Sequence, residues 1–169
     1  MRLFPSRTYR SGMRWCAWRW TDVDPEGKGE TYLTRLHLFQ TPWFSCMLHW
    51  ILRADPQSDL HDHPNAFLSI ILQGWYEEEV PEPGSESNLI VRRITLWNFK
   101  HSTDHHRIVA LSKPLLTLVI AGPVVRGWGF HTPKGWEAWR EYVARHRSES
   151  TAACPTSSKD QSESKIFDE

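Results

Sequence analysis

Strand-like alternation over residues 31 to 131 is the feature that most restricts the fold. In residues 31–39, TYLTRLHLF, successive side chains alternate between two faces, and residues 43–52 form a second β-rich run of strand length. Further runs of this kind are residues 66–80, where Gly74 is expected to kink or bulge the strand, and residues 88–97, 105–111, 115–122 and 124–130. With turn signals between them, these roughly seven or eight strands predict an antiparallel barrel or a double-sheet sandwich.

A helix is expected only after these strands, in residues 131–147, HTPKGWEAWREYVARHR. Thr132 can cap the helix, Pro133 suits its first position, and Trp136 and Val143 lie at helical spacing. We expect this helix to lay its tryptophan face across the outside of the sheet.

Length and composition predict one packed domain with extensions at both ends. The chain has 169 residues, 40% of them hydrophobic. We place the domain in residues 31–146, after an Arg/Trp-rich extension at residues 1–30. Residues 147–169 are rich in Ser and charge, and we expect them to be disordered. The N-terminal tryptophans could stack on nucleic-acid bases or lie at a membrane interface, but we favour packing on the outside of the fold.

The charge balance and the cysteines restrict the class of function. A formal net charge of +0 gives no field that favours nucleic acid or an anionic membrane. Three cysteines without metal or redox spacing suit reduced thiols, and the longest apolar run is far below the roughly 20 residues of a membrane span. We therefore expect a cytoplasmic protein in which a local site acts on a small molecule.

The segment DLHDHP, residues 59–64, is a candidate metal-binding sequence. On a strand, His61 and His63 would project to the same side with Cα atoms about 6.5 to 7 Å apart, so both imidazoles could reach one cation. Asp62 would face the other way, where it could orient a ligand. Two histidines at this spacing also occur as ordinary surface residues, so the pair alone leaves both interpretations open.

The segment HSTDHHRIVAL, residues 101–111, is where a third ligand would be found. His106 begins a predicted strand, and His105 faces the opposite way. We expect His106 to point inward and to complete the site.

Four segments together, DLHDHPNAFLSIILQGWYEEE, HHRI, LLTLVIAGP and WGFHTPKGWEAWREY, resemble the small, largely uncharacterised bacterial and phage cupin proteins with an H-D-H-P motif. The match covers roughly residues 31–143. The resemblance implies an all-β, double-stranded β-helix barrel of the jelly-roll kind with the C-terminal helix packed outside. It also implies a divalent metal inside the barrel, bound by His61, His63 and His106. The general cupin pattern has a glutamate ligand where this chain has Phe67, whereas its glycine matches Gly74.

A site of three histidines without a carboxylate leaves metal positions open for water, dioxygen or substrate, and it resembles the iron site of some cupin thiol dioxygenases. We therefore predict a non-haem iron dioxygenase or hydroxylase that acts on a small molecule or side chain, with Fe(II) preferred and Zn, Ni or Mn as other metals. One alternative is a zinc or nickel isomerase or hydrolase. The other is a non-enzymatic binding module with a structural or vestigial metal site, which Phe67 favours.

Tyr76 and Arg107 are the predicted catalytic residues. The Tyr76 hydroxyl could donate to substrate or oxygen, and Arg107 could bind a substrate carboxylate. Residues 77–79 are three glutamates that could supply the missing carboxylate, although we favour a solvated strand end. His49 is assigned to the core and His131 to a structural junction. The oligomeric state stays open, with a homodimer as one option.

Overall fold

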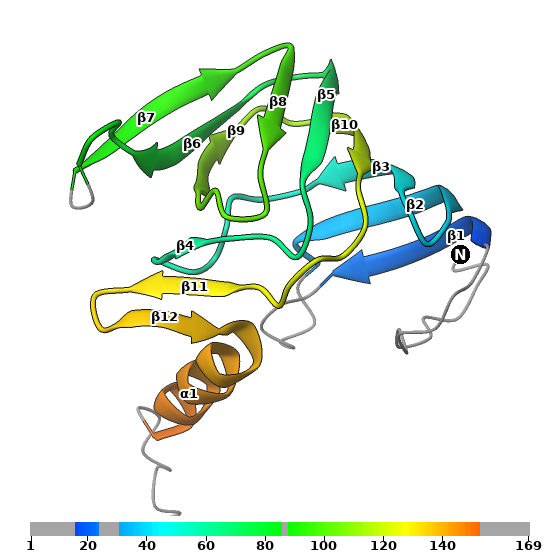
Figure 1. Ribbon diagram of the computed structural model, residues 1–169. Helices are drawn as coiled ribbons and strands as arrows, with labels where there is room; N and C mark the ends of the chain where they lie inside the picture. Colours follow the sequence, from blue (N-terminus) through cyan, green and yellow to red (C-terminus); the bar gives the residue numbers. More distant parts are fainter. Residues whose placement is uncertain (1–15, 24–30, 86–87, 153–169) are drawn as a thin grey trace, which may run out of the picture.

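The computed structural model describes residues 16–23, 31–85 and 88–152 (Figure 1). Its elements are β1 (Cys16–Val23), β2 (Leu33–Gln40), β3 (Ser45–Ile51), β4 (Leu60–His61), β5 (Phe67–Gln73), β6 (Tyr76–Pro81), β7 (Leu89–Ile94), β8 (Trp97–Lys100), β9 (Arg107–Leu111), β10 (Leu115–Ala121), β11 (Gly129–Thr132), β12 (Gly135–Ala138) and α1 (Trp139–Ala152). The described part of the chain is therefore almost entirely β-structure.

The strands form a barrel of two facing sheets (Figure 1). One sheet has the order β1-β2-β3-β10-β5-β8. On the other side, β7-β6-β9 and β12-β11-β4 are joined through a backbone bridge between His61 and His106. The strands β3-β10-β5-β8 and β7-β6-β9-β4 thus make two four-stranded sheets in jelly-roll order, the architecture found in cupins. This confirms the predicted all-β, cupin-like fold.

Gly74 lies where the chain leaves one sheet and enters the other. Its φ is +88°, and a Cβ there would lie 2.2 Å from Ser112 Oγ and 2.6 Å from the Pro114 carbonyl oxygen, so only glycine fits. The prediction of one kinked strand over residues 66–80 is therefore wrong. The run forms two strands, β5 and β6, that belong to different sheets.

Two other predicted strands are shorter or divided. Residues 88–97 form two strands, β7 and β8, again in different sheets. In residues 124–130 the strand begins only at Gly129. In both segments the apolar run includes residues that lie outside the strands, and the alternation pattern does not reveal where a strand begins or ends.

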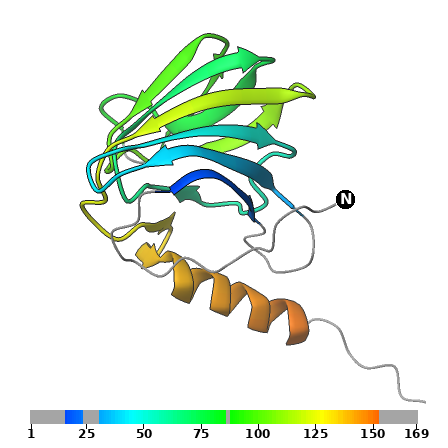
Figure 2. The same ribbon diagram turned by 90° about the vertical axis from the view of Figure 1, so that its right-hand side faces the viewer.

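The predicted start of the helix is also wrong. Residues 132–135 form the hairpin turn between β11 and β12, in which Thr132 Oγ1 accepts the Lys134 N–H (3.2 Å) and donates to the Gly135 carbonyl oxygen (2.9 Å). The helix α1 begins at Trp139. It packs against β11 and β12, outside the barrel, through Tyr142 stacked on Phe130 at 3.9 Å between ring centroids. Figure 2 shows α1 along this side of the barrel.

Two observations bear on the predicted domain limits. Strand β1 pairs with β2, so part of the predicted N-terminal extension belongs to the sheet, and α1 continues to Ala152, beyond residue 146. Residues 1–15 and 153–169 lie outside the described residues, so the roles assigned to them stay predictions. In the described part of the chain, no helix is long and apolar enough to cross a membrane.

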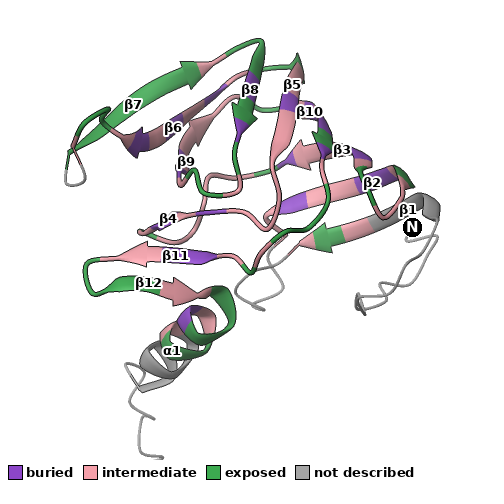
Figure 3. Cartoon of the chain, in the orientation of Figure 1, coloured by how far each residue is buried: buried purple, intermediate pink, exposed green. Residues whose placement is uncertain are grey.

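The core contains two clusters of buried apolar residues. Figure 3 shows how buried residues are distributed along the strands. The first joins the two sheets through Leu33, Ile51, Tyr76, Ile108 and Leu115. The second contains Met47, Val119 and Ala121, with Phe67 packed against them. Burial of this apolar surface stabilises the barrel, and the second cluster borders the site described next.

Candidate metal centre

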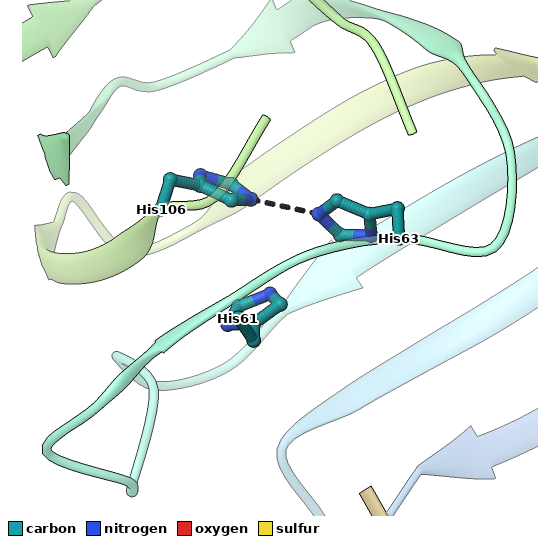
Figure 4. Close-up of side chains that lie close together, drawn as sticks. All are labelled: His61, His63 and His106. Atoms are coloured by element: carbon teal, nitrogen blue, oxygen red, sulfur yellow. Dashed lines mark hydrogen bonds between the residues drawn. The ribbon is translucent and has the colours of Figure 1, made fainter. Parts of the chain in front are cut away.

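Three histidines from two distant segments meet inside the barrel (Figure 4). His61 ends β4, His63 follows in the loop, and His106 directly precedes β9. One nitrogen from each ring lies within 4.8 Å of the other two. The ring centroids are 4.9 to 5.1 Å apart, so the three imidazoles surround one small volume.

Backbone pairing brings these histidines together. The His61 N–H donates to the His106 carbonyl oxygen (2.9 Å), and the His106 N–H donates back to the His61 carbonyl oxygen (3.0 Å). Residues paired in this way have Cβ atoms about 5 Å apart on one face. His63 reaches the same face from the loop after β4, not from the strand position that we predicted. The structure thus brings together the three predicted ligands, and the expectation that His106 points inward is correct.

The nitrogen geometry suits a cation. His63 Nε2 and His106 Nε2 are 2.9 Å apart (Figure 4). Two nitrogens at about 2.1 Å from one metal, at right angles, would be about 3 Å apart. Burial lowers the pKa of His61 to about 4, and burial followed by the charges of His61 and His106 holds the pKa of His63 well below its usual range. Both rings are therefore neutral near pH 7, with lone pairs to offer.

Glu78 holds the far side of the His106 ring. Its Oε2 lies 2.5 Å from His106 Nδ1, and the side chain is fully buried. Arg92 Nε (2.7 Å) and Lys100 Nζ (3.2 Å) contact the same carboxylate. Burial alone would raise the pKa of Glu78, but the hydrogen bond from His106 and the neighbouring Lys100 and Arg92 lower it to about 2. An ionised carboxylate on Nδ1 leaves Nε2 of His106 free to face a metal.

A second carboxylate lies near His61. Asp55 Oδ2 is 3.7 Å from His61 Nδ1, and it accepts the Ile108 N–H at 2.6 Å. Its charge opposes the effect of burial on the pKa of His61. His106 thus has a carboxylate hydrogen-bonded to its Nδ1, an arrangement typical of metal ligands, whereas Asp55 lies beyond hydrogen-bond distance of His61 and acts on it through charge.

Sequence reasoning missed Lys100 and Asp55, and it considered Glu78 only as a metal ligand or a solvated residue, not as the partner of His106. The interpretation of residues 77–79 as a solvated strand end is wrong for Glu78, whereas Glu77 and Glu79 pair with arginines on the outside. The signal was available, because Tyr76, Glu78 and Val80 alternate onto the inner face of β6. For Lys100 and Asp55, no comparable pattern exists in the sequence.

Phe67 occupies the position of the usual cupin glutamate. Its ring packs edge-on against His63, with centroids 4.6 Å apart, and it pairs with Lys100 across the β5-β8 ladder. It gives the cluster an apolar wall instead of a carboxylate. Among the described residues, no glutamate joins the three-histidine group.

Asp62 does not orient a ligand as expected. It is fully buried and accepts hydrogen bonds from the Gly129 N–H (2.7 Å) and from Trp136 Nε1 (2.9 Å). Arg126 lies 2.9 Å away and His131 3.4 Å away. Asp62 therefore fastens the β11-β12 hairpin to the segment that carries the histidines.

The two predicted catalytic residues lie in different surroundings. Tyr76 is buried in the first core cluster and accepts a hydrogen bond from Asn98 Nδ2 (2.8 Å), while burial and Glu78 raise its pKa. Arg107 points away from His106, toward the Glu79 carboxylate and the Ser58 carbonyl oxygen. Catalytic roles for both stay predictions, and the contacts of Arg107 do not favour one.

No family model matches this sequence, and no curated protein is similar to it. Several solved structures are similar. KdgF from Halomonas sp. is 21% identical with a TM-score of 0.46, over 62% of this chain and 86% of that chain. The DMSP lyase DddQ from Ruegeria pomeroyi is 17% identical with a TM-score of 0.49, over 70% of this chain and 63% of that chain. An RmlC-like cupin from Shewanella frigidimarina is 14% identical with a TM-score of 0.43, over 63% of this chain and 84% of that chain.

Identities this low do not bear on activity. The fold is evident from the strand order itself, with two facing four-stranded sheets in jelly-roll order and three histidines gathered between them. This chain is an all-β protein with a cupin-like barrel.

Proposed function

We propose that His61, His63 and His106 bind one divalent metal ion, and that the protein is a non-haem iron dioxygenase or hydroxylase acting on a small molecule. The convergence of the three ring nitrogens within 4.8 Å carries this proposal. Three imidazoles, one of them hydrogen-bonded through Nδ1 to the buried Glu78 carboxylate, form a donor set that fits a divalent transition metal.

The surrounding residues prepare the cluster for this role. Glu78 accepts the Nδ1–H of His106 and so selects the tautomer whose Nε2 lone pair faces the cluster. Lys100 and Arg92 keep Glu78 ionised. The protein therefore orients the His106 ring before any metal binds.

Bound Fe(II) would supply open coordination positions at which dioxygen and a substrate react. Apolar rings limit the access of water to this volume. Phe67 packs on His63, and the ring centroids of Trp128 and Phe130 lie 6.3 and 6.1 Å from that of His61. A dry surrounding strengthens the electrostatic interactions of a bound substrate.

One observation favours a second candidate. Three histidines with no carboxylate ligand also make up the donor set of some catalytic zinc sites, in which the metal polarises water or a carbonyl group. A zinc or nickel hydrolase or isomerase is therefore the alternative. The identity of the metal and its reaction with a gaseous ligand separate the two.

The first test is metal binding. The protein, purified without oxygen and loaded with Fe(II), should hold close to one iron per chain by elemental analysis. His106→Ala should reduce the metal content by more than about tenfold, because it removes one of three ligands. His101→Ala, at an exposed histidine outside the cluster, is the matched control and should retain the metal. Equal metal content in the two variants would refute the site.

The second test separates iron oxygenase chemistry from the zinc alternative. Nitric oxide added to the iron-loaded protein should give the EPR signal of an iron–nitrosyl adduct, because open positions accept a diatomic ligand. An iron-loaded protein that gives no such signal would support the alternative instead.

A further inference from the structure

A row of polar side chains crosses the inner face of the six-stranded sheet, opposite the histidine cluster. Arg35 on β2 pairs with His49 on β3, and His49 pairs with Thr117 on β10. Residues paired across antiparallel strands project to one side. Leu33, Ile51 and Leu115 lie two positions from Arg35, His49 and Thr117 on the same strands, and they belong to the first core cluster. Because side chains two positions apart on a strand share a face, the row also faces the interior.

Two atoms of this row have unusual surroundings for buried polar groups. Thr117 is fully buried, and its Oγ1 has no hydrogen-bond partner among the described residues. The same is true of the buried His49 Nε2. An unpaired buried polar atom costs free energy, so native proteins keep few of them without a reason. Two side by side in the interior indicate a ligand that would satisfy them.

The charge of the row indicates which ligand. Arg35 supplies a guanidinium, the donor that matches a carboxylate best, and Thr117 supplies a hydroxyl. Burial, followed by the charges of Arg35 and His37, holds the pKa of His49 well below its usual range, so this ring is a neutral donor or acceptor. Two positions from His49 and Thr117, Met47 and Val119 pack against Phe67, whose ring lies 4.6 Å from that of His63 between centroids, so the row lies near the cluster.

We propose that Arg35, His49 and Thr117 bind a carboxylate group of the substrate, whose other end faces the histidine cluster. The claim that the bound molecule reacts at the histidine cluster rests on the proposed function. The binding of its carboxylate does not depend on that function. Facing sheets lie about 10 Å apart, a distance that a molecule of a few heavy atoms can span. The substrate class is therefore a small carboxylic acid, and its reacting group lies away from the carboxylate.

The test uses propionate and its neutral isostere propionamide. Isothermal titration with metal-free and metal-loaded protein should show propionate binding to both forms, and propionamide should bind at least about tenfold more weakly because it carries no charge. Arg35→Gln should reduce propionate affinity by about tenfold or more in the metal-free protein. Arg93→Gln, at an exposed arginine paired with Glu77 outside the barrel, is the matched control and should leave the affinity unchanged.

Thr117→Val tests the site in a variant that is expected to fold as the unmodified protein does. Valine keeps the shape and removes the unpaired hydroxyl, so thermal unfolding of the free protein should occur at the same or a higher temperature. Propionate affinity should nevertheless fall several-fold. A drop in stability together with unchanged propionate binding would show a purely structural hydroxyl and overturn the role of Thr117.

The outcomes distinguish this inference from the proposed function. Binding that depends on Arg35 in a protein that takes up no metal would support the carboxylate site and refute the metal centre. Binding seen only with metal, and equal in Arg35→Gln and Arg93→Gln, would mean that the carboxylate ligates the metal directly. That result would overturn the inference and leave the metal centre intact.

Discussion

The surroundings of Glu78 and Asp62 differ although both carboxylates are fully buried. Glu78 contacts a ring of the histidine cluster and two cationic side chains. Asp62 contacts a backbone N–H, an indole N–H and Arg126. The first arrangement orients a candidate ligand, whereas the second holds a hairpin in place.

This difference teaches that burial alone does not identify a functional carboxylate. Asp62 stands between two of the histidines in sequence, yet its side chain bonds to β11 and β12. Glu78 is far from them in sequence, yet it touches the cluster. Substitutions at the two positions should therefore affect different properties, stability at Asp62 and metal affinity at Glu78.

The largest effect is expected for Asp62→Ala. Removing this carboxylate leaves the Trp136 indole and the Gly129 N–H without their acceptor and removes the ion-pair partner of Arg126, at a cost of about 3 to 5 kcal/mol in the free energy of unfolding. Urea denaturation measures this cost. Asp104→Ala, which removes an exposed carboxylate bonded to the His101 N–H, should cost about 1 kcal/mol or less. A similar cost for the two variants would contradict the structural role of Asp62.

Glu78→Gln should act on the metal. The amide keeps the shape but binds the Nδ1–H of His106 more weakly, so Fe(II) affinity should fall by about 10- to 100-fold. Competition with a chromophoric chelator measures it. Glu77→Gln, which changes the outward-facing neighbour, should leave the affinity within about twofold, because exposed ion pairs contribute little. If the two variants bind metal equally, Glu78 does not orient the ligand.

The smallest effect is expected for Trp136→Phe. An aromatic ring, though a smaller one, stays at this position, but the Nε1–H that donates to Asp62 is lost, at a cost of about 1 kcal/mol in the free energy of unfolding. Metal affinity should not change. A loss of affinity as large as that of Glu78→Gln would show that the two carboxylates do not act independently.

Local patterns predicted much of the fold because they report on single strands. Alternation identified the strand regions, and the spacing of His61 and His63 made them candidate ligands of one metal, although His63 lies in the loop after β4. The same patterns failed where one sequence fits two structures. Thr132 and Pro133 suit a helix start, but they also suit a hairpin turn, and pairing of β11 with β12 selects the turn.

The three consecutive glutamates show the same limit inside the candidate site. The three residues are of the same type, and a run of charged residues usually faces solvent. Their exposure depends on the register of β6 against β7 and β9, which turns only Glu78 inward. Once inside, it is stabilised by Lys100 from the facing sheet, a partner that no spacing in the sequence could indicate.

By itself, the sequence determined the all-β class and a break in regular backbone at Gly74, because side-chain periodicity and backbone freedom are local properties. It also offered His61, His63 and His106 as candidate ligands. The tertiary structure alone decided which carboxylate supports the cluster, which one holds the hairpin, and which polar row faces the histidines across the barrel. Those relations join residues from strands far apart in the chain, and they exist only after the two sheets have closed on each other.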